Sequence, residues 1–130
     1  MTHYYLRIVG MSANVAVDEE ASRWAKELGK GATRLALLAT LEAGESYGYE
    51  ILATLRARGA RSVGTTEAAI YPLLKDLEAK GYLKGQWRAT DAGVPPRKYY
   101  ALTASGGKLL IAMRKEWTNY QKEMKHLMDT

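Results

Sequence analysis

The sequence predicts a mainly α-helical protein with one small β-hairpin. Three observations support this fold class. Apolar residues recur at helical spacing through most of residues 17–81. Two aromatic-rich segments with strand-like alternation follow, over residues 82–88 and 97–103. A long final helix is expected over residues 104–130, and a chain of 130 residues is enough for one domain with a modest core.

The N-terminal part is expected to become helical only after an irregular start. Residues 1–16 show no clear periodicity, so we expect a flexible arm there. A first helix is expected over residues 17–28, where acidic residues near the start and lysines towards the end suit the helix dipole. Gly29 and Gly31 then predict a break or a kink before a second helix over residues 32–42. The inward-facing residues of that second helix are expected to be Leu35, Leu38, Ala39 and Leu41.

A third helix is expected over residues 48–58, after a short turn at residues 45–47 and before Gly59, which ends it. Its apolar face is expected to comprise Tyr49, Ile51, Leu52 and Leu55.

Residues 65–81 are the most regularly patterned segment and predict an amphipathic helix. Thr65 or Thr66 can cap its start, Glu67 suits the positive end of its dipole, and Gly81 ends it. Its buried face is expected to carry Ile70, Leu73, Leu74 and Leu77. Its opposite face carries groups able to reach a partner, namely Thr66, Tyr71, Lys75 and Glu78. Taken alone, the pattern also fits an ordinary surface helix.

The helices over residues 48–58 and 65–81, joined by a short connection that contains glycine, are typical of a helix-turn-helix. A β-hairpin follows, with strands over residues 82–88 and 97–103 and a proline-stiffened loop over residues 91–96. A hairpin directly after a helix-turn-helix predicts the winged arrangement. The basic residues beside the loop are placed to meet phosphates or to enter a minor groove, and they are Arg88, Arg97 and Lys98.

The excess positive charge is localised. The formal net charge of +5 lies within residues 56–98, where nine lysine and arginine residues outnumber four acidic ones, whereas the rest of the chain is balanced. Such a distribution is expected of a phosphate-binding face. The alternative is a basic surface that serves only solubility.

The final helix, over residues 104–130, carries an apolar seam of two and a half heptads. The seam residues are Leu110, Met113, Trp117, Tyr120, Met124 and Leu127. This face is larger than one small domain can cover, so we expect a dimerisation helix, with the helix around Trp24 joining the interface. The alternative is that the helix folds back on its own domain. That domain, the winged helix-turn-helix with its N-terminal helix, is expected to span residues 17–103.

Several function classes lack support in the sequence. The chain has no cysteine, which excludes disulfides and thiolate metal sites and fits a cytoplasmic protein. His3 and His126 are far apart, and neither lies in a metal-binding pattern. Phosphate-loop and serine-nucleophile motifs are also lacking. We therefore expect no enzyme activity, no cofactor and, for want of a long apolar run, no membrane span.

Three motifs together resemble the PadR family of bacterial winged-helix transcription regulators. They are GYEI at residues 48–51, IYPLLKDLEAKG at residues 70–81 and PPRKYYALTASG at residues 95–106. The likeness extends over about residues 27–127. It implies a homodimer that binds a palindromic DNA operator, usually represses transcription and releases the DNA when a small molecule binds. The extension through Leu28 departs from the shorter members of the family.

Carried over to this chain, the resemblance makes residues 65–75 the major-groove helix and residues 91–98 the wing. The residues expected to bind DNA are Thr65, Thr66, Glu67, Ala68, Tyr71, Lys75, Arg88, Arg97 and Lys98. Trp117 resembles the tryptophan that stacks on flat aromatic effectors in the multidrug-sensing subgroup, and the resemblance places Leu35 and Gln121 nearby. A tryptophan in a heptad seam also fits simple packing.

The sequence therefore predicts a homodimeric DNA-binding transcriptional regulator, expected to be a repressor that a small aromatic effector releases from its operator. The alternative is a winged-helix protein-interaction module that does not bind DNA. A ligand-binding protein that has lost its DNA function is a third reading, which the basic residues beside the wing argue against.

Overall fold

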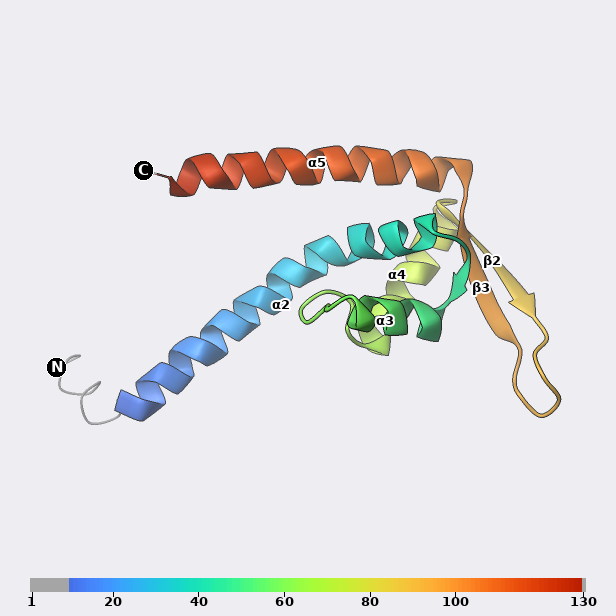
Figure 1. Ribbon diagram of the computed structural model, residues 1–130, viewed down its shortest axis with the longest axis horizontal. Coiled ribbons are helices and arrows are strands. Elements are labelled where there is room, and N and C mark those ends of the chain that lie inside the picture. Colours follow the sequence, from blue (N-terminus) through green and yellow to red (C-terminus); the bar gives the residue numbers. More distant parts are fainter. Residues whose placement is uncertain (1–9, 130) are drawn as a thin grey trace.

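The computed structural model describes residues 10–129 of the chain. Five of its helices and strands match the expected positions within a few residues, and two features differ. In chain order the elements are α2 (Gly10–Glu42), β1 (Ser46–Tyr47), α3 (Gly48–Ala57), α4 (Glu67–Ala79), β2 (Leu83–Arg88), β3 (Arg97–Leu102) and α5 (Ala104–Met128). Figure 1 shows α2 and α5 extending to one side as two long arms, while the β2–β3 hairpin projects on the other side. Within residues 10–129, no helix is both long enough and apolar enough to cross a membrane.

The sheet is small and antiparallel, with strand order β1-β3-β2. The hairpin register runs from Leu83 opposite Leu102 to Arg88 opposite Arg97. Strand β1 pairs Tyr47 with Tyr99, although the sequence predicts only a turn there. A two-residue strand has no periodicity of its own, so only its partner β3 reveals it. Through this pairing, the base of the hairpin is joined to the start of α3.

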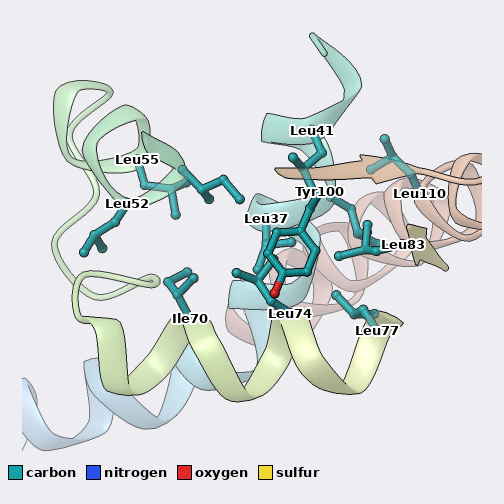
Figure 2. Packing of buried hydrophobic residues seen from close by; sticks show 12 residues of the cluster. Leu37, Leu41, Leu52, Leu55, Ile70, Leu74, Leu77, Leu83, Tyr100 and Leu110 are labelled. Carbon is teal, nitrogen blue, oxygen red and sulfur yellow. The ribbon is translucent and has the colours of Figure 1, made fainter. Parts of the chain in front are cut away.

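The core lies where the helices meet the inner face of the sheet (Figure 2). It confirms the inward positions predicted for α4, with Ile70, Leu74 and Leu77 buried and Leu73 partly buried. Every described element except β1 contributes at least one fully or largely buried apolar side chain. The other members are Leu37, Leu38, Leu41, Ile51, Leu52, Leu55, Leu83, Tyr100 and Leu110. Burying one leucine stabilises the fold by about 2 kcal/mol, so these contacts hold α4 and the hairpin in fixed positions.

One inward-facing assignment is wrong, and one buried residue was not predicted. Tyr49 is 60% exposed, because helical spacing turns it away from Ile51 and Leu55. In α2, the predicted Leu35 is partly buried and packs against the core, and Leu37, which was not predicted to face inward, is fully buried.

Helix α2 runs without interruption from Gly10 to Glu42, so of the two alternatives predicted at Gly29 and Gly31 the break is wrong. Residues 10–16, predicted to belong to a flexible arm, are helical, and the rest of that predicted arm lies outside the described residues. The helix bends rather than breaks (Figure 1), and the Thr33 hydroxyl donates a 2.6 Å hydrogen bond to the Gly29 carbonyl, a contact that favours bending. Gly29 is buried at the point where the backbone of Ser62 approaches α2, and a Cβ atom there would collide with the Ser62 carbonyl oxygen. Gly29 is thus a packing residue.

The two glycines of α2 should respond oppositely to the same substitution. Gly31→Ala should raise the free energy of unfolding by about 0.5–1 kcal/mol, because Gly31 is exposed in a helix and a Cβ atom there meets nothing within 4 Å. Gly29→Ala should lower it by about 1–3 kcal/mol, because the Ser62 backbone must move away. Urea unfolding at one fixed protein concentration measures both. Equal stabilisation of the two variants would contradict the packing role of Gly29.

Candidate nucleic-acid interface

The start of α4 is held from two directions. The Thr66 side chain caps the helix, as predicted, and its hydroxyl accepts a hydrogen bond from the Ala69 N–H at 3.2 Å. The guanidinium of Arg56 donates two hydrogen bonds to the Thr65 carbonyl, at 2.6 and 3.2 Å. This second contact links the end of α3 to the residue before the cap. No sequence pattern indicates this contact, because Arg56 has the features of an ordinary surface cation of α3.

The exposed residues of α4 gather at its first turns. Thr66, Glu67 and Ala68 are exposed, and Lys75 is exposed further along, whereas Thr65 is partly buried. A helix that offers small and polar side chains at a free N-terminal end has the form of a major-groove reader. The predicted base-facing segment is thus accessible.

Tyr71 links α4 to the start of α3. It is 44% exposed, and its ring lies over Gly48, where a Cβ atom would be 2.9 Å from the Tyr71 hydroxyl oxygen. The N-cap residue of α3, Tyr47, makes no side-chain capping bond. The Tyr71 hydroxyl therefore lies beside a helix start without a side-chain cap, a combination that suits a phosphate oxygen.

The loop of the hairpin is ordered by its own hydrogen bonds. The Val94 N–H donates to the Asp91 carbonyl at 3.0 Å, and the Thr90 hydroxyl contacts the carbonyls of Val94 and Pro95 at 3.0 and 3.2 Å. Gly93 has a φ of +84°, which favours glycine over any residue with a side chain. The loop at the tip of the wing is therefore held in a defined conformation.

The cations beside the wing loop are in three different environments. Arg88 forms a two-pronged ion pair with Glu45, with Nη2 2.7 Å from Oε2, and its guanidinium lies 4.8 Å from the centre of the Tyr99 ring. These hydrogen bonds lower the pKa of the Glu45 carboxyl, so the carboxylate stays charged and compensates Arg88. Lys98 turns towards α4, where its Nζ lies 2.7 Å from Oε1 of Glu78. Its charge is also compensated.

Arg97 differs from both. Its guanidinium stacks over the Tyr47 ring at 4.5 Å, and across residues 10–129 no carboxylate lies within ion-pair distance of it. Arg97 is exposed, whereas Lys98 is partly buried. Of the three basic residues predicted beside the loop, Arg97 is the one with an uncompensated charge.

Trp87 is an exposed residue that the sequence reasoning did not select. It lies on β2 opposite Lys98, and 67% of it is exposed. The one sequence feature that could have indicated Trp87 is that an aromatic residue stands in the strand that leads to the loop. That signal supports a strand assignment but does not indicate which face is free.

A second concave region lies between α2 and α5, away from the hairpin. Figure 1 shows the two helices diverging there, and the groove between them has a volume of about 730 Å³. Leu35 and Trp117, two of the predicted effector residues, line it, whereas Gln121 does not. Trp117 stacks on Tyr120 with ring centres 6.1 Å apart. The acidic residues that line the groove are Glu27, Glu116 and Glu123.

Much of the predicted seam of α5 is left uncovered by the other residues between positions 10 and 129. Leu110 is buried in the core and Met113 packs against it, but Trp117, Tyr120 and Leu127 are exposed. On α2, Trp24 is likewise exposed, at 61%. The seam therefore leaves the core after Met113 and continues as a free apolar stripe.

The described part of the chain offers no group of histidine, aspartate and glutamate side chains that could hold a metal ion. The side chains named above at the two sites can form hydrogen bonds, stack on aromatic rings and carry charge.

Comparisons with known proteins agree with this geometry. The family model for the PadR-like transcriptional regulators matches residues 37–112. The chain is similar to a PadR-family regulator from Eggerthella lenta, with 28% identity, a TM-score of 0.79, and coverage of 89% of this chain and 98% of that one. A PadR-like regulator from Bacillus cereus shows 29% identity, a TM-score of 0.66 and coverage of 80% and 98%. One from Clostridium difficile shows 29% identity, a TM-score of 0.64 and coverage of 75% and 98%.

A comparison with curated protein sequences finds no match. The family model alone spans more than half of the chain, and it includes the helix-turn-helix and the hairpin described above. The chain belongs to the PadR-like family of transcriptional regulators.

Proposed function

We propose that this DNA-binding regulator is a cytoplasmic repressor that binds a palindromic operator as a homodimer and leaves it when a small flat aromatic compound binds. The observation that supports this most is the free cation Arg97 on the hairpin of a chain that also exposes the start of α4 and belongs to a family of regulators rather than enzymes.

In the proposed complex, α4 enters the major groove of each half-site. Thr65, Thr66, Glu67 and Ala68 face the base edges, where threonine and alanine methyl groups suit thymine. Lys75 and Tyr71 reach phosphates. Two copies then read half-sites about one helical turn apart.

The wing contributes affinity that depends on salt rather than on sequence. Arg97 carries this contribution, because Arg88 and Lys98 already have carboxylate partners within the chain. A free cation that neutralises one phosphate releases one counterion, which steepens the dependence of affinity on salt.

The free stripe on α5 supports the proposed homodimer. We propose that the exposed seam residues of α5 pack against the same helix of a second copy, with Trp24 of α2 at the edge of the interface. An apolar stripe of this kind on a helix is typical of a surface that a partner covers.

The effector site is the groove between α2 and α5, beside the dimer seam. Trp117 and Tyr120 offer stacked aromatic faces for a flat ring system. Because three glutamates line the groove, a flat compound with a positive charge suits it better than an acidic one. Such a ligand shifts DNA binding only by its different affinities for the bound and free arrangements of the dimer.

The central experiment selects bound fragments from random duplex DNA with the purified protein and then titrates the best fragment against salt. A two-fold symmetric site would support the homodimeric operator. A folded protein that enriches no sequence would instead favour the protein-interaction module.

Arg97→Ala should weaken binding to every duplex and flatten the salt dependence. The slope of log K against log salt should fall by about 0.9 for each Arg97, or about two units for a dimer on two half-sites. Lys115→Ala is the matched control, because Lys115 is an exposed cation on α5, distant from the hairpin. An unchanged slope for Arg97→Ala would remove Arg97 from the DNA contact.

The dimer can be tested with two double variants that add the same charge to opposite faces of α5. Tyr120→Glu with Leu127→Glu places two carboxylates in the free seam and should yield monomers by light scattering. Ile111→Glu with Thr118→Glu alters exposed positions on the other face and should leave the dimer intact. If both double variants remain dimeric, the interface lies elsewhere.

The effector proposal predicts two distinct losses at Trp117. Trp117→Ala should abolish both the fluorescence quenching by planar aromatic cations and the DNA release that they cause, because the stacking surface is gone. Trp117→Phe should lose most of the quenching but retain release, because a ring remains. Trp87→Phe, which removes an exposed tryptophan on the wing, should retain both. Full release from the Trp117→Ala variant would move the effector site away from the groove.

A further inference from the structure

Glu78 on α4 contacts both strands of the hairpin. Its Oε1 accepts a 2.7 Å hydrogen bond from Lys98 Nζ on β3. Its Oε2 accepts a 3.2 Å hydrogen bond from the Gly85 N–H on β2. One carboxylate thus joins the DNA-facing helix to both strands of the hairpin.

The Gly85 contact completes the edge of the sheet. Strand β2 lies at the edge in the order β1-β3-β2, so amides that point away from β3 have no strand partner. Glu78 supplies the acceptor for one of them. A Cβ atom at Gly85 would lie 2.5 Å from Oε2 of Glu78 and would collide with the aliphatic stem of Lys98. Glycine at this position therefore makes room for the ion pair.

Lys98 is enclosed rather than presented. The side chains of Lys98 and Glu78 are only 27% and 29% exposed. The Lys98 Nζ also lies 5.4 Å from the centre of the Tyr100 ring and 5.9 Å from that of Trp87. The hydrogen bond to Glu78 is the main cause of a raised pKa of Lys98, so Lys98 keeps its positive charge at neutral pH.

We propose that Glu78, Lys98 and the Gly85 N–H form a clamp that fixes the angle between α4 and the wing, so that both reach the same DNA site together. Lys98 is then a positioning residue, and phosphate contact is left to Arg97. This inference rests on the proposed DNA binding and corrects the expectation that Lys98 meets phosphate.

The position of the clamp makes a geometric role reasonable. At the base, the hairpin is held to the core by Leu83 and Tyr100, but its tip projects away from the helices (Figure 1). Lys98 lies one residue from the start of β3, opposite Trp87, near the loop end of the hairpin. The Gly85 N–H lies opposite Tyr100, and Lys98 is two residues nearer the loop than Tyr100. The clamp therefore adds a direct contact between α4 and both strands, and it extends the restraint from the base towards the tip.

The clamp and a simple charge model predict opposite signs for one substitution. Glu78→Gln removes a negative charge near the DNA and would free Lys98 for phosphate. On charge alone, DNA affinity should rise and the salt dependence should steepen. If the clamp is correct, affinity falls because the wing loses its fixed angle, and the salt slope stays unchanged.

The experiment measures DNA affinity and its salt slope for Glu78→Gln, Lys98→Met and the double variant, each verified as folded by thermal unfolding. We expect each single variant to bind roughly tenfold more weakly and the double variant to lose no more than either, as for residues that act as one unit. Asp76→Asn is the control, since Asp76 is an acid of α4 that pairs with Arg34 and Lys80 instead of the hairpin. Its affinity should not fall.

Two results would overturn the clamp. One is tighter binding by Glu78→Gln, and the other is a salt slope for Lys98→Met that falls by about 0.9 for each copy. Lys98→Met alone decides the matter if Glu78→Gln does not fold.

A measurement without DNA separates failure of the clamp from failure of the proposed function. Hydrogen exchange of the Gly85 amide in the free protein should accelerate in Glu78→Ala, because its acceptor is lost. Unchanged exchange would overturn the clamp. A wild-type protein that binds no duplex would overturn the proposed function, with the exchange result unaffected.

Discussion

The structure depends on the burial of one face of α4. Ile70, Leu74 and Leu77 are almost completely inaccessible, and they pack in a core to which α2, α3, α5 and two strands contribute. Because these side chains fix the rotation of α4, the same packing decides which of its residues face outward. Thr66, Tyr71 and Lys75 are available to a partner as a direct consequence. The packing of these three apolar side chains therefore determines which side chains of α4 can contact a partner.

Charge counted along the sequence overstates the charge that a phosphate would meet. The excess of +5 lies around α4 and the wing, yet Arg88 and Lys98 are both compensated by carboxylates. One of these acids, Glu45, lies outside the basic segment, and the other, Glu78, lies within it. The wing is therefore organised as much by internal ion pairs as by exposed cations. The surface around α4 and the wing still has a net positive charge, but fewer of its cations are free to contact a phosphate than the sequence suggests.

Local patterns predicted most of the fold. The cap at Thr66, the buried face of α4 and the two hairpin strands all follow from spacing within a few residues, and the structure has them. Apart from the exposed Tyr49, the features that were missed depend on partners distant in sequence. Glycine in α2 suggested an interruption because the approach of the Ser62 backbone was invisible, and Arg88 gave no hint of Glu45, 43 residues earlier. The roles of the DNA-facing and effector residues stay predictions.

The close approach of Ser62 to Gly29 places one segment between the groove and the start of α4. Ser62 and Val63 line the groove between the long helices, and the same segment leads within a few residues to the cap of α4. Arg56 holds the Thr65 carbonyl at the end of this segment. If the proposed effector binds in the groove, it contacts the segment whose backbone sets where α4 begins. In the proposed function, the path from effector to DNA is then as short as one loop within a single subunit, alongside any route through the proposed dimer.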